Sequence, residues 1–235
     1  MESSRERGLK MMKVKRYTEP PFWDNFLDKE PLCLSLVENY EVIKKEALRL
    51  EKICSYKIPG YGPFPNFKNV YVIDREVKWL IASFFGCRYD NHARRRASRL
   101  HLLIGDIGAF FTRLFCPQTY KLLKPLFDDK IVLNAYYTIA SPDVYIKPHI
   151  HPQANGIHRM NIHLGLCCDP EATVTVGEET RTWEEGKLLA FKNSGPYRHS
   201  VFHAGHNDRV ILIVEVDVAY LEKYGVYRGE RIKDV

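Results

Sequence analysis

Apolar and polar residues alternate along two segments in the second half of the chain. Between Arg159 and Leu166 the even positions are all apolar, whereas the odd positions carry Arg, Asn, His and Gly. The same alternation follows Arg209, where the even positions from 210 to 218 are Val, Leu, Val, Val and Val. A period of two is typical of a β-strand with one face in the core. The polar face of such a strand meets either solvent or a functional site.

Short runs rich in β-forming residues recur from Ile131 onward, separated by Pro, Gly, Asn and Asp. Strands between turn residues at this spacing are typical of an antiparallel sandwich or a jelly roll. The predicted strands are 131–139, 160–166, 172–176, 187–191 and 209–218.

The first half of the chain indicates mixed helix and loop. Near-helical spacing of Leu34, Val37, Ile43 and Leu48 predicts one amphipathic helix over 31–51 that covers the core. Pro and Gly then interrupt regular structure over 58–65. Further along, the pattern predicts a strand over 69–79, a helix over 101–115 and a short helix over 117–123 with proline at its start.

Length and composition favour one domain. A chain of 235 residues with 45% hydrophobic content can bury one core beneath a helical layer. We expect a flexible N-terminus at 1–20, a mixed helical and loop portion at 21–125 packed on the core, and a β core at 126–235. The oligomeric state is left open.

Charge gives only weak information about partners. The formal net charge of +6 mildly favours acidic small molecules or anionic surfaces. The densest basic stretch, Arg94 to Arg96 with Arg99, has no interleaved aromatic residues and no nucleic-acid-binding signature, so we interpret it as a solvated helix face. No nucleic-acid partner is expected.

Cysteines and apolar runs indicate an intracellular protein. The six cysteines lack the regular spacing of a disulfide scaffold, and no apolar leader precedes them, so a reducing, cytoplasmic location is expected. The longest apolar stretches, 79–87 and 102–115, are too short or too interrupted to span a bilayer. No transmembrane segment is predicted.

Histidines carry the clearest chemical signal. Pro148 holds its neighbour extended, so His149 is expected at a strand end or on a rigid loop. His149 and His199, followed by Arg209, suit an oxygen-activating iron with an acidic cosubstrate. The short H-x-[DE] iron motif is absent, because position 151 is His. Structural or zinc-binding histidines would also explain the spacing.

Several blocks of residues follow one another in order along the chain, at 116–119, 148–149, 163–166, 182–191, His199 and 209–216. Together these blocks closely resemble the C-terminal half of the aspartyl/asparaginyl β-hydroxylase family. The resemblance covers roughly 110 to 220. It implies a double-stranded β-helix, a cupin-like jelly roll with a helical N-terminal layer, and a dioxygenase that uses Fe(II), 2-oxoglutarate and O2.

The resemblance also assigns roles to individual residues. His149 and His199 fall on the family's two iron ligands. Arg209 falls on the arginine that pairs with the distal carboxylate of 2-oxoglutarate, a task that suits a guanidinium fork. His163 matches a histidine that helps to hold the cosubstrate, and Thr138 matches an assisting hydroxyl. The alternative for His163 is a hydrogen-bonded core histidine.

The chain departs from the family pattern at several positions. His151 stands where the family has glycine, and Asn161 stands where it has an arginine, with Arg159 the nearest substitute for cosubstrate binding. Lys192 replaces a common aspartate. We expect the His151 side chain to point at the substrate or to form a hydrogen bond nearby, with a role as third metal ligand as the alternative. Residues 149 and 151 of one strand share a face, which permits ligation without requiring it.

The leading hypothesis is therefore a dioxygenase that hydroxylates an unactivated C–H bond. By resemblance, the substrate is an Asp or Asn side chain of a peptide, a lipid or a small molecule. A three-histidine, cupin-type metal oxygenase that does not use 2-oxoglutarate is one alternative. A catalytically inactive β-helix that serves as a binding module is the other.

Overall fold

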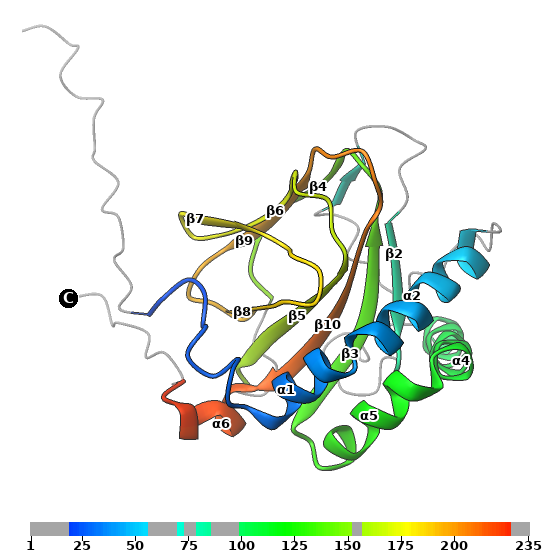
Figure 1. The fold of residues 1–235 in the computed structure, drawn as a ribbon, viewed down its shortest axis with the longest axis horizontal. Helices are drawn as coiled ribbons and strands as arrows, with labels where there is room; N and C mark the ends of the chain where they lie inside the picture. Colours follow the sequence, from blue (N-terminus) through cyan, green and yellow to red (C-terminus); the bar gives the residue numbers. More distant parts are fainter. Residues whose placement is uncertain (1–18, 56–69, 73–78, 86–98, 152–156, 227–235) are drawn as a thin grey trace, which may run out of the picture.

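Two antiparallel sheets face each other in the computed structural model, which describes residues 19–55, 70–72, 79–85, 99–151 and 157–226 (Figure 1). The smaller sheet has the strand order β1-β4-β9-β6-β7, and the larger has the order β2-β3-β10-β5-β8. The strands are β1 (Val70–Val72), β2 (Trp79–Ser83), β3 (Val132–Ala140), β4 (Val144–His149), β5 (Arg159–Cys167), β6 (Ala172–Val176), β7 (Glu179–Thr182), β8 (Leu188–Lys192), β9 (His199–His203) and β10 (Arg209–Asp217).

The strands form one long hairpin that is rolled up. β6 and β7 pair at the tip of this hairpin. The next pairs, in order of distance from the tip, are β5 with β8, β4 with β9, and β3 with β10. Strands on each arm alternate between the two sheets. This connectivity is that of a jelly roll, or double-stranded β-helix, and the predicted fold class is confirmed.

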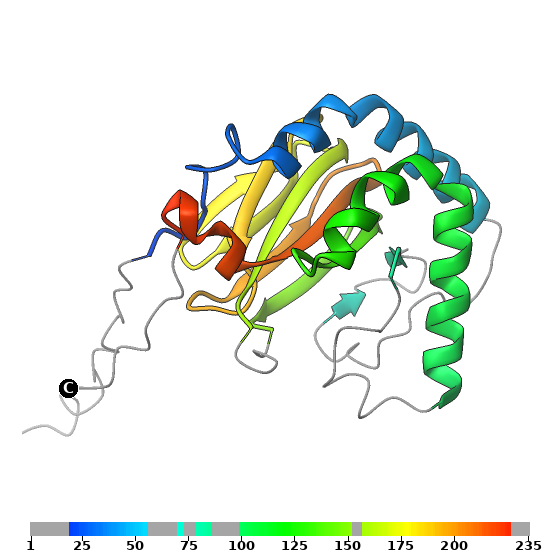
Figure 2. The ribbon, with the colours of Figure 1, turned by 90° about the horizontal axis from the view of Figure 1, so that it is seen from below.

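Helices cover the outer face of the larger sheet (Figure 2). Ile162 of β5 and Leu212 of β10 pack there in one cluster with Leu36 and Ile43. The even positions of the two alternating segments therefore do face a core, as predicted. The helices are α1 (Pro31–Glu38), α2 (Tyr40–Ser55), α4 (Arg99–Phe115), α5 (Pro117–Asp128), α6 (Val218–Leu221) and the 3-10 helix η2 (Glu222–Tyr224).

The prediction of one helix over 31–51 is wrong, because the chain forms two helices that meet at Asn39. Both the backbone N–H and the side-chain amide of Asn39 donate to the carbonyl of Ser35, at 3.1 and 2.8 Å. Asparagine side chains that bond to nearby backbone groups compete with helix continuation. The Asn39 carbonyl then accepts from Ile43 N–H and starts the second helix.

A buried carboxylate joins α2 to α5. Glu46 accepts hydrogen bonds from the backbone N–H groups of Gln118 and Thr119, both at 2.9 Å, and from the Thr119 hydroxyl at 2.7 Å. The N-cap residue Cys116 makes no side-chain capping bond, so Glu46 satisfies donors that the first turn of α5 leaves open. The helix extends to Asp128, beyond the predicted end at Leu123.

Other differences from the predicted elements are local. β4 ends at His149, which is one of the two placements that Pro148 predicted, a strand end or a rigid loop. The short strands β2, β7 and β9 were not expected. The predicted strand over 69–79 corresponds to β1, and 73–78 lie outside the described residues. The predicted flexible N-terminus up to residue 18, the break at 58–65 and the basic run at 94–96 also lie outside them. Within the part of the chain that is described, no helix is long and apolar enough to cross a bilayer.

Candidate active site

The space between the two sheets contains both apolar and polar side chains. Val174 and Val201 of the smaller sheet pack there with Phe191 and Ile211 of the larger. The odd positions of β5 share this interior, and His163 is only 3% exposed. The polar face of β5 could have met either solvent or a functional site. Its central residues lie in this interior and therefore do not face solvent.

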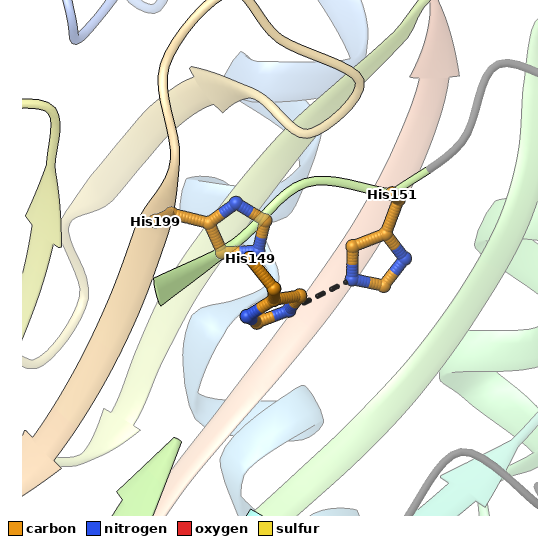
Figure 3. Close-up of side chains that lie close together, drawn as sticks. All are labelled: His149, His151 and His199. Carbon is orange, nitrogen blue, oxygen red and sulfur yellow. Dashed lines mark hydrogen bonds between the residues drawn. The ribbon is translucent and has the colours of Figure 1, made fainter. Parts of the chain in front are cut away.

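Three imidazoles come together at one end of this interior (Figure 3). His149 is the last residue of β4, and its register partner on β9 is His199, the first residue of that strand. His151 lies two residues beyond the end of β4. Each of the three offers a ring nitrogen, and these atoms lie within 4.8 Å of one another. Such a cluster can hold a metal ion.

The spacing within the cluster suits metal ligation. Nε2 of His149 and Nε2 of His151 are 3.1 Å apart, and Nδ1 of His149 lies 2.7 Å from the carbonyl of Lys147. Donation of Nδ1–H to that carbonyl leaves the lone pair of His149 Nε2 directed into the cluster. Two nitrogens bound at right angles to one ion, each at about 2.1 Å, would be about 3 Å apart. This separation is compatible with His151 as a third ligand, and it is also that of a hydrogen bond between the two rings, which Figure 3 draws.

Burial favours the neutral form of two of these imidazoles, His149 and His199. His199 is 5% exposed, and its Nδ1 has no hydrogen-bond partner among the described residues. Burial lowers the pKa of His199 well below its usual range, and the neighbouring histidines lower it further. Burial also lowers the pKa of His149. Neutral imidazole is the form that binds metal.

The same interior contains a buried cation, Arg209, for which the described residues supply no counter-ion. Arg209 is 2% exposed, and it donates through Nη2 to the Thr138 hydroxyl at 3.2 Å. Its guanidinium carbon lies 4.5 Å from the centre of the Trp183 ring. Burial lowers the Arg209 pKa to about 10, so the side chain stays charged at neutral pH. No acidic group in the described part of the chain forms an ion pair with it, and its Nε has no partner there. This arrangement can bind an anion.

His163 presents a second donor to the interior. Trp183 Nε1–H donates to His163 Nδ1 at 3.1 Å, so the neutral ring carries its proton on Nε2. Burial and the charge of Arg209 lower the His163 pKa to about 3. Within the described ranges Nε2 has no hydrogen-bond partner. His163 is thus buried but not fully hydrogen-bonded, and the Phe191 ring lies 5.0 Å from both His163 and His199.

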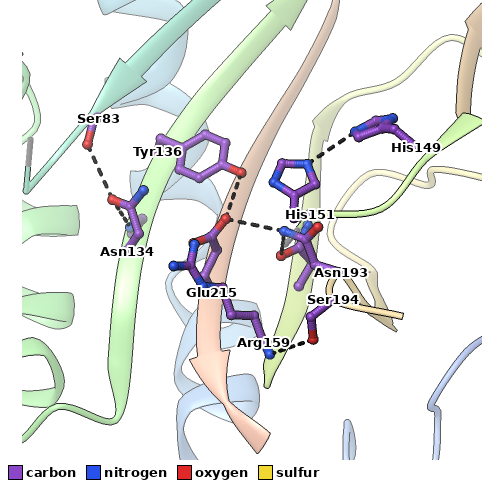
Figure 4. Close-up of polar contacts among 11 residues, drawn as sticks. Ser83, Asn134, Tyr136, His149, His151, Arg159, Asn193, Ser194 and Glu215 are labelled. Atoms are coloured by element: carbon purple, nitrogen blue, oxygen red, sulfur yellow. Dashed lines mark hydrogen bonds and ion pairs between the residues drawn. The ribbon is translucent and has the colours of Figure 1, made fainter. Parts of the chain in front are cut away.

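Next to the histidine cluster, Arg159 and Asn161 belong to a polar network around Glu215 (Figure 4). Arg159 Nη1 lies 3.3 Å from Glu215 Oε2, and their side chains are 12% and 5% exposed. Tyr136 OH and Asn193 Nδ2 donate to Glu215 Oε1, at 3.2 and 3.4 Å. Asn193 Nδ2 also donates to Asn161 Oδ1 at 3.0 Å. Neither position 159 nor position 161 therefore offers an unpaired charge.

Lys192 forms a buried ion pair with Glu19. Its ammonium contacts the Glu19 carboxylate at 2.5 Å, with side-chain exposures of 3% and 5%. It also lies 4.9 Å from the centre of the Trp23 ring. The lysine at the family's aspartate position thus anchors the segment before α1 to the end of β8.

Sequence reasoning missed four residues of this interior as site residues: Trp183, Glu215, Asn193 and Tyr136. For Glu215 a signal was available, because it lies on the odd face of the alternating segment after Arg209. Its register partners are Asn161 on β5 and Asn134 on β3. Nothing in the local sequence indicates that Asn193 reaches the same point from the loop after β8.

A family model described as Aspartyl/Asparaginyl beta-hydroxylase matches residues 37–218. The mouse aspartate beta-hydroxylase domain-containing protein 2 is 33% identical over 107 residues, which cover 43% of this chain and 30% of that protein. The mouse aspartyl/asparaginyl beta-hydroxylase is 38% identical over 81 residues, covering 34% of this chain and 10% of that protein. The matched region is thus less than a third of either relative.

Solved structures show a partial likeness. A Cupin 2 conserved barrel domain protein from Salinispora arenicola is 16% identical with a TM-score of 0.27, and the match covers 39% of this chain and 69% of that one.

Proposed function

The chain belongs to the aspartyl/asparaginyl β-hydroxylase family, and from this premise we propose that it is an Fe(II)- and 2-oxoglutarate-dependent hydroxylase. The observation that carries the proposal is the pair of buried donors, Arg209 and His163, beside the histidine cluster. A buried guanidinium without a counter-ion is costly, and an anionic cosubstrate would supply the missing charge.

The histidine cluster fits an iron ion. His149 and His199 would hold the metal from paired strands, and His151 would provide a third nitrogen. Imidazole suits iron among other metals, and three ligands on one side of an ion leave positions for a cosubstrate and oxygen. The Lys147 carbonyl would orient His149, as outer partners of ligating histidines commonly do.

The deeper residues fit the two ends of 2-oxoglutarate. Arg209 would receive the distal carboxylate through its guanidinium, with the Thr138 hydroxyl beside it. His163 would donate its Nε2–H toward the end nearer the metal, because Trp183 fixes the proton on that nitrogen. The cosubstrate would then satisfy donors that have no partner among the described residues.

Bound iron, oxygen and 2-oxoglutarate would supply oxidation of an unactivated C–H bond to an alcohol, one oxygen atom entering the product and the other entering succinate, with release of carbon dioxide. The chain itself would orient the reactants and exclude water. Phe191 and Ile213 line the interior next to His163, and both are buried. An Asp or Asn side chain of a peptide is the substrate that the family description suggests.

A second candidate is a three-histidine metal oxygenase that does not use 2-oxoglutarate. The histidine cluster by itself supports it equally well. The buried Arg209, which such an enzyme would not require, favours the first candidate.

The test combines metal analysis with cosubstrate turnover. Purified protein would be loaded anaerobically with Fe(II), and its metal content and the release of succinate from 2-oxoglutarate would be measured in the presence of oxygen and ascorbate. We expect about one iron per chain, succinate release and loss of iron in His199→Ala, whereas His206→Ala, which alters an exposed histidine, should retain the metal. Iron binding without any interaction with 2-oxoglutarate would favour the second candidate. Failure to bind any metal would favour an inactive binding module.

A further inference from the structure

The network around Glu215 adjoins the histidine cluster. His151 donates its backbone N–H to the carbonyl of Asn193 at 3.1 Å, so one residue contacts both groups. Figure 4 draws Asn193 between the imidazoles and Glu215. His163 and Asn161 occupy successive positions on the same face of β5. A substrate that approaches the metal from this side would meet the network.

The network is neutral and its charges are already paired. Arg159 contacts Glu215 at 3.3 Å, and both side chains are almost completely buried. Burial raises the pKa of Tyr136 well above its usual range, so this group is an uncharged donor to Glu215. A substrate carboxylate placed here would lie near the Glu215 carboxylate, and the Arg159 guanidinium is already engaged. Burial of like charges without a free cation is unfavourable.

Two atoms of the network have no hydrogen-bond partner among the described residues, although both are buried. They are Nε of Arg159, which can only donate, and Oδ1 of Asn193, which can only accept. The orientation of the Asn193 amide is determined by its surroundings. Its nitrogen lies 3.4 Å from a Glu215 oxygen, and an ionised carboxylate only accepts hydrogen bonds.

An unpaired donor and an unpaired acceptor together match a carboxamide. A side-chain amide offers one carbonyl oxygen to accept from Arg159 and an NH2 group to donate to Asn193, whereas a carboxylate offers only acceptors. We infer that the side chain presented to the metal is a neutral carboxamide, as in a peptide asparagine, and that an aspartate is rejected. This inference rests on the proposed function and concerns the substrate class of the same site.

Matched peptide pools test the inference. Two pools with identical randomised flanks and a fixed central Asn or Asp would be incubated with the iron-loaded protein, 2-oxoglutarate and oxygen. Peptide-stimulated succinate release and the gain of one oxygen atom by mass spectrometry would be measured. We expect the Asn pool to be converted at least about tenfold faster, because a site with buried polar partners discriminates strongly against a ligand that leaves them unpaired.

A variant tests whether the charge of Glu215 causes the preference for Asn over Asp. Glu215→Gln removes the buried anion with little change in shape and releases Arg159, so the ratio of Asn to Asp conversion should fall markedly or reverse while iron content stays unchanged. Glu179→Gln alters a more exposed acid on β7 and should leave the ratio as it is. A urea unfolding curve for each variant would verify that it is folded.

The possible failures are distinct. Equal conversion of the two pools, a preference for Asp, or conversion of neither pool by protein that binds iron and consumes 2-oxoglutarate would overturn the carboxamide assignment. Absence of iron binding or of any interaction with 2-oxoglutarate would instead overturn the proposed function.

Discussion

Trp183 donates its indole N–H to Nδ1 of His163 at 3.1 Å, and this bond determines which nitrogen of His163 carries the proton. The Trp183 ring also lies 4.5 Å from the Arg209 guanidinium carbon. One side chain from the segment between β7 and β8 therefore positions both donors that we assign to the cosubstrate.

Replacement of this indole separates its two roles. Trp183→Phe keeps an aromatic face for Arg209 but removes the N–H, so His163 can exchange its proton between nitrogens. We expect the 2-oxoglutarate concentration for half-maximal succinate release to rise about fivefold, which corresponds to about 1 kcal/mol for one hydrogen bond. Iron content should not change. An unaltered 2-oxoglutarate dependence would mean that His163 does not act through this tautomer.

Loss of the buried guanidinium should have a larger effect. Arg209→Ala would leave the distal carboxylate of the cosubstrate without its partner, at a cost of about 2–5 kcal/mol. Titration of 2-oxoglutarate into iron-loaded protein would measure the loss of affinity. Arg209→Lys retains the charge but not the planar fork. Its affinity for 2-oxoglutarate should lie between those of Arg209→Ala and the original protein. Unchanged binding in Arg209→Ala would move this role to another residue.

The role of His151 is open to a direct metal titration. If His151 is a ligand, as the 3.1 Å separation of its Nε2 from His149 Nε2 permits, His151→Gly should weaken iron binding by at least about tenfold. His206→Gly removes an exposed histidine and is the matched control. Retained affinity in His151→Gly would support the role first expected for this residue, which is contact with the substrate or a hydrogen bond nearby.

Stability should depend on the carboxylate that joins α2 to α5. Glu46→Ala leaves two N–H groups at the start of α5 without their acceptor and removes one of the two hydrogen bonds of the Thr119 hydroxyl. We expect the free energy of unfolding to fall by about 1–3 kcal/mol. Urea denaturation would measure the change. Glu41→Ala, at an exposed position of the same helix, should cost less than about 1 kcal/mol.

A pH dependence should arise at Asp169. Its carboxylate accepts from the backbone N–H groups of Glu171, His206 and Asn207, and these bonds lower its pKa from 3.8 to about 2. Because the pKa is lower in the folded protein, the resulting stability is present above the unfolded value and is lost as pH falls from about 4 to about 2.

The difference in unfolding free energy between the original protein and Asp169→Ala isolates this contribution. It should be constant near neutral pH and shrink over that acidic interval. A difference that does not vary with pH would show that the carboxylate charge contributes nothing.

The sequence alone predicted the fold class and many residues of the candidate site. The period-two alternation of β5 and β10 is set by the geometry of a strand, so it identified which side chains lie in a core before any tertiary contact was known. The spaced blocks that include His149, His199 and Arg209 led to the family, because their order along the chain is readable without knowledge of distance.

Tertiary structure decided the features that depend on distant partners. The break at Asn39 depends on a competing side-chain bond that hydrophobic spacing does not encode. The polar face of β5 could have met solvent, and only the second sheet encloses it. Arg159 was a candidate for the cosubstrate until the fold paired it with Glu215, which is 56 residues away in the chain. Charge pairing, burial and the absence of a partner are properties of a three-dimensional arrangement, and a linear pattern carries no direct signal for them.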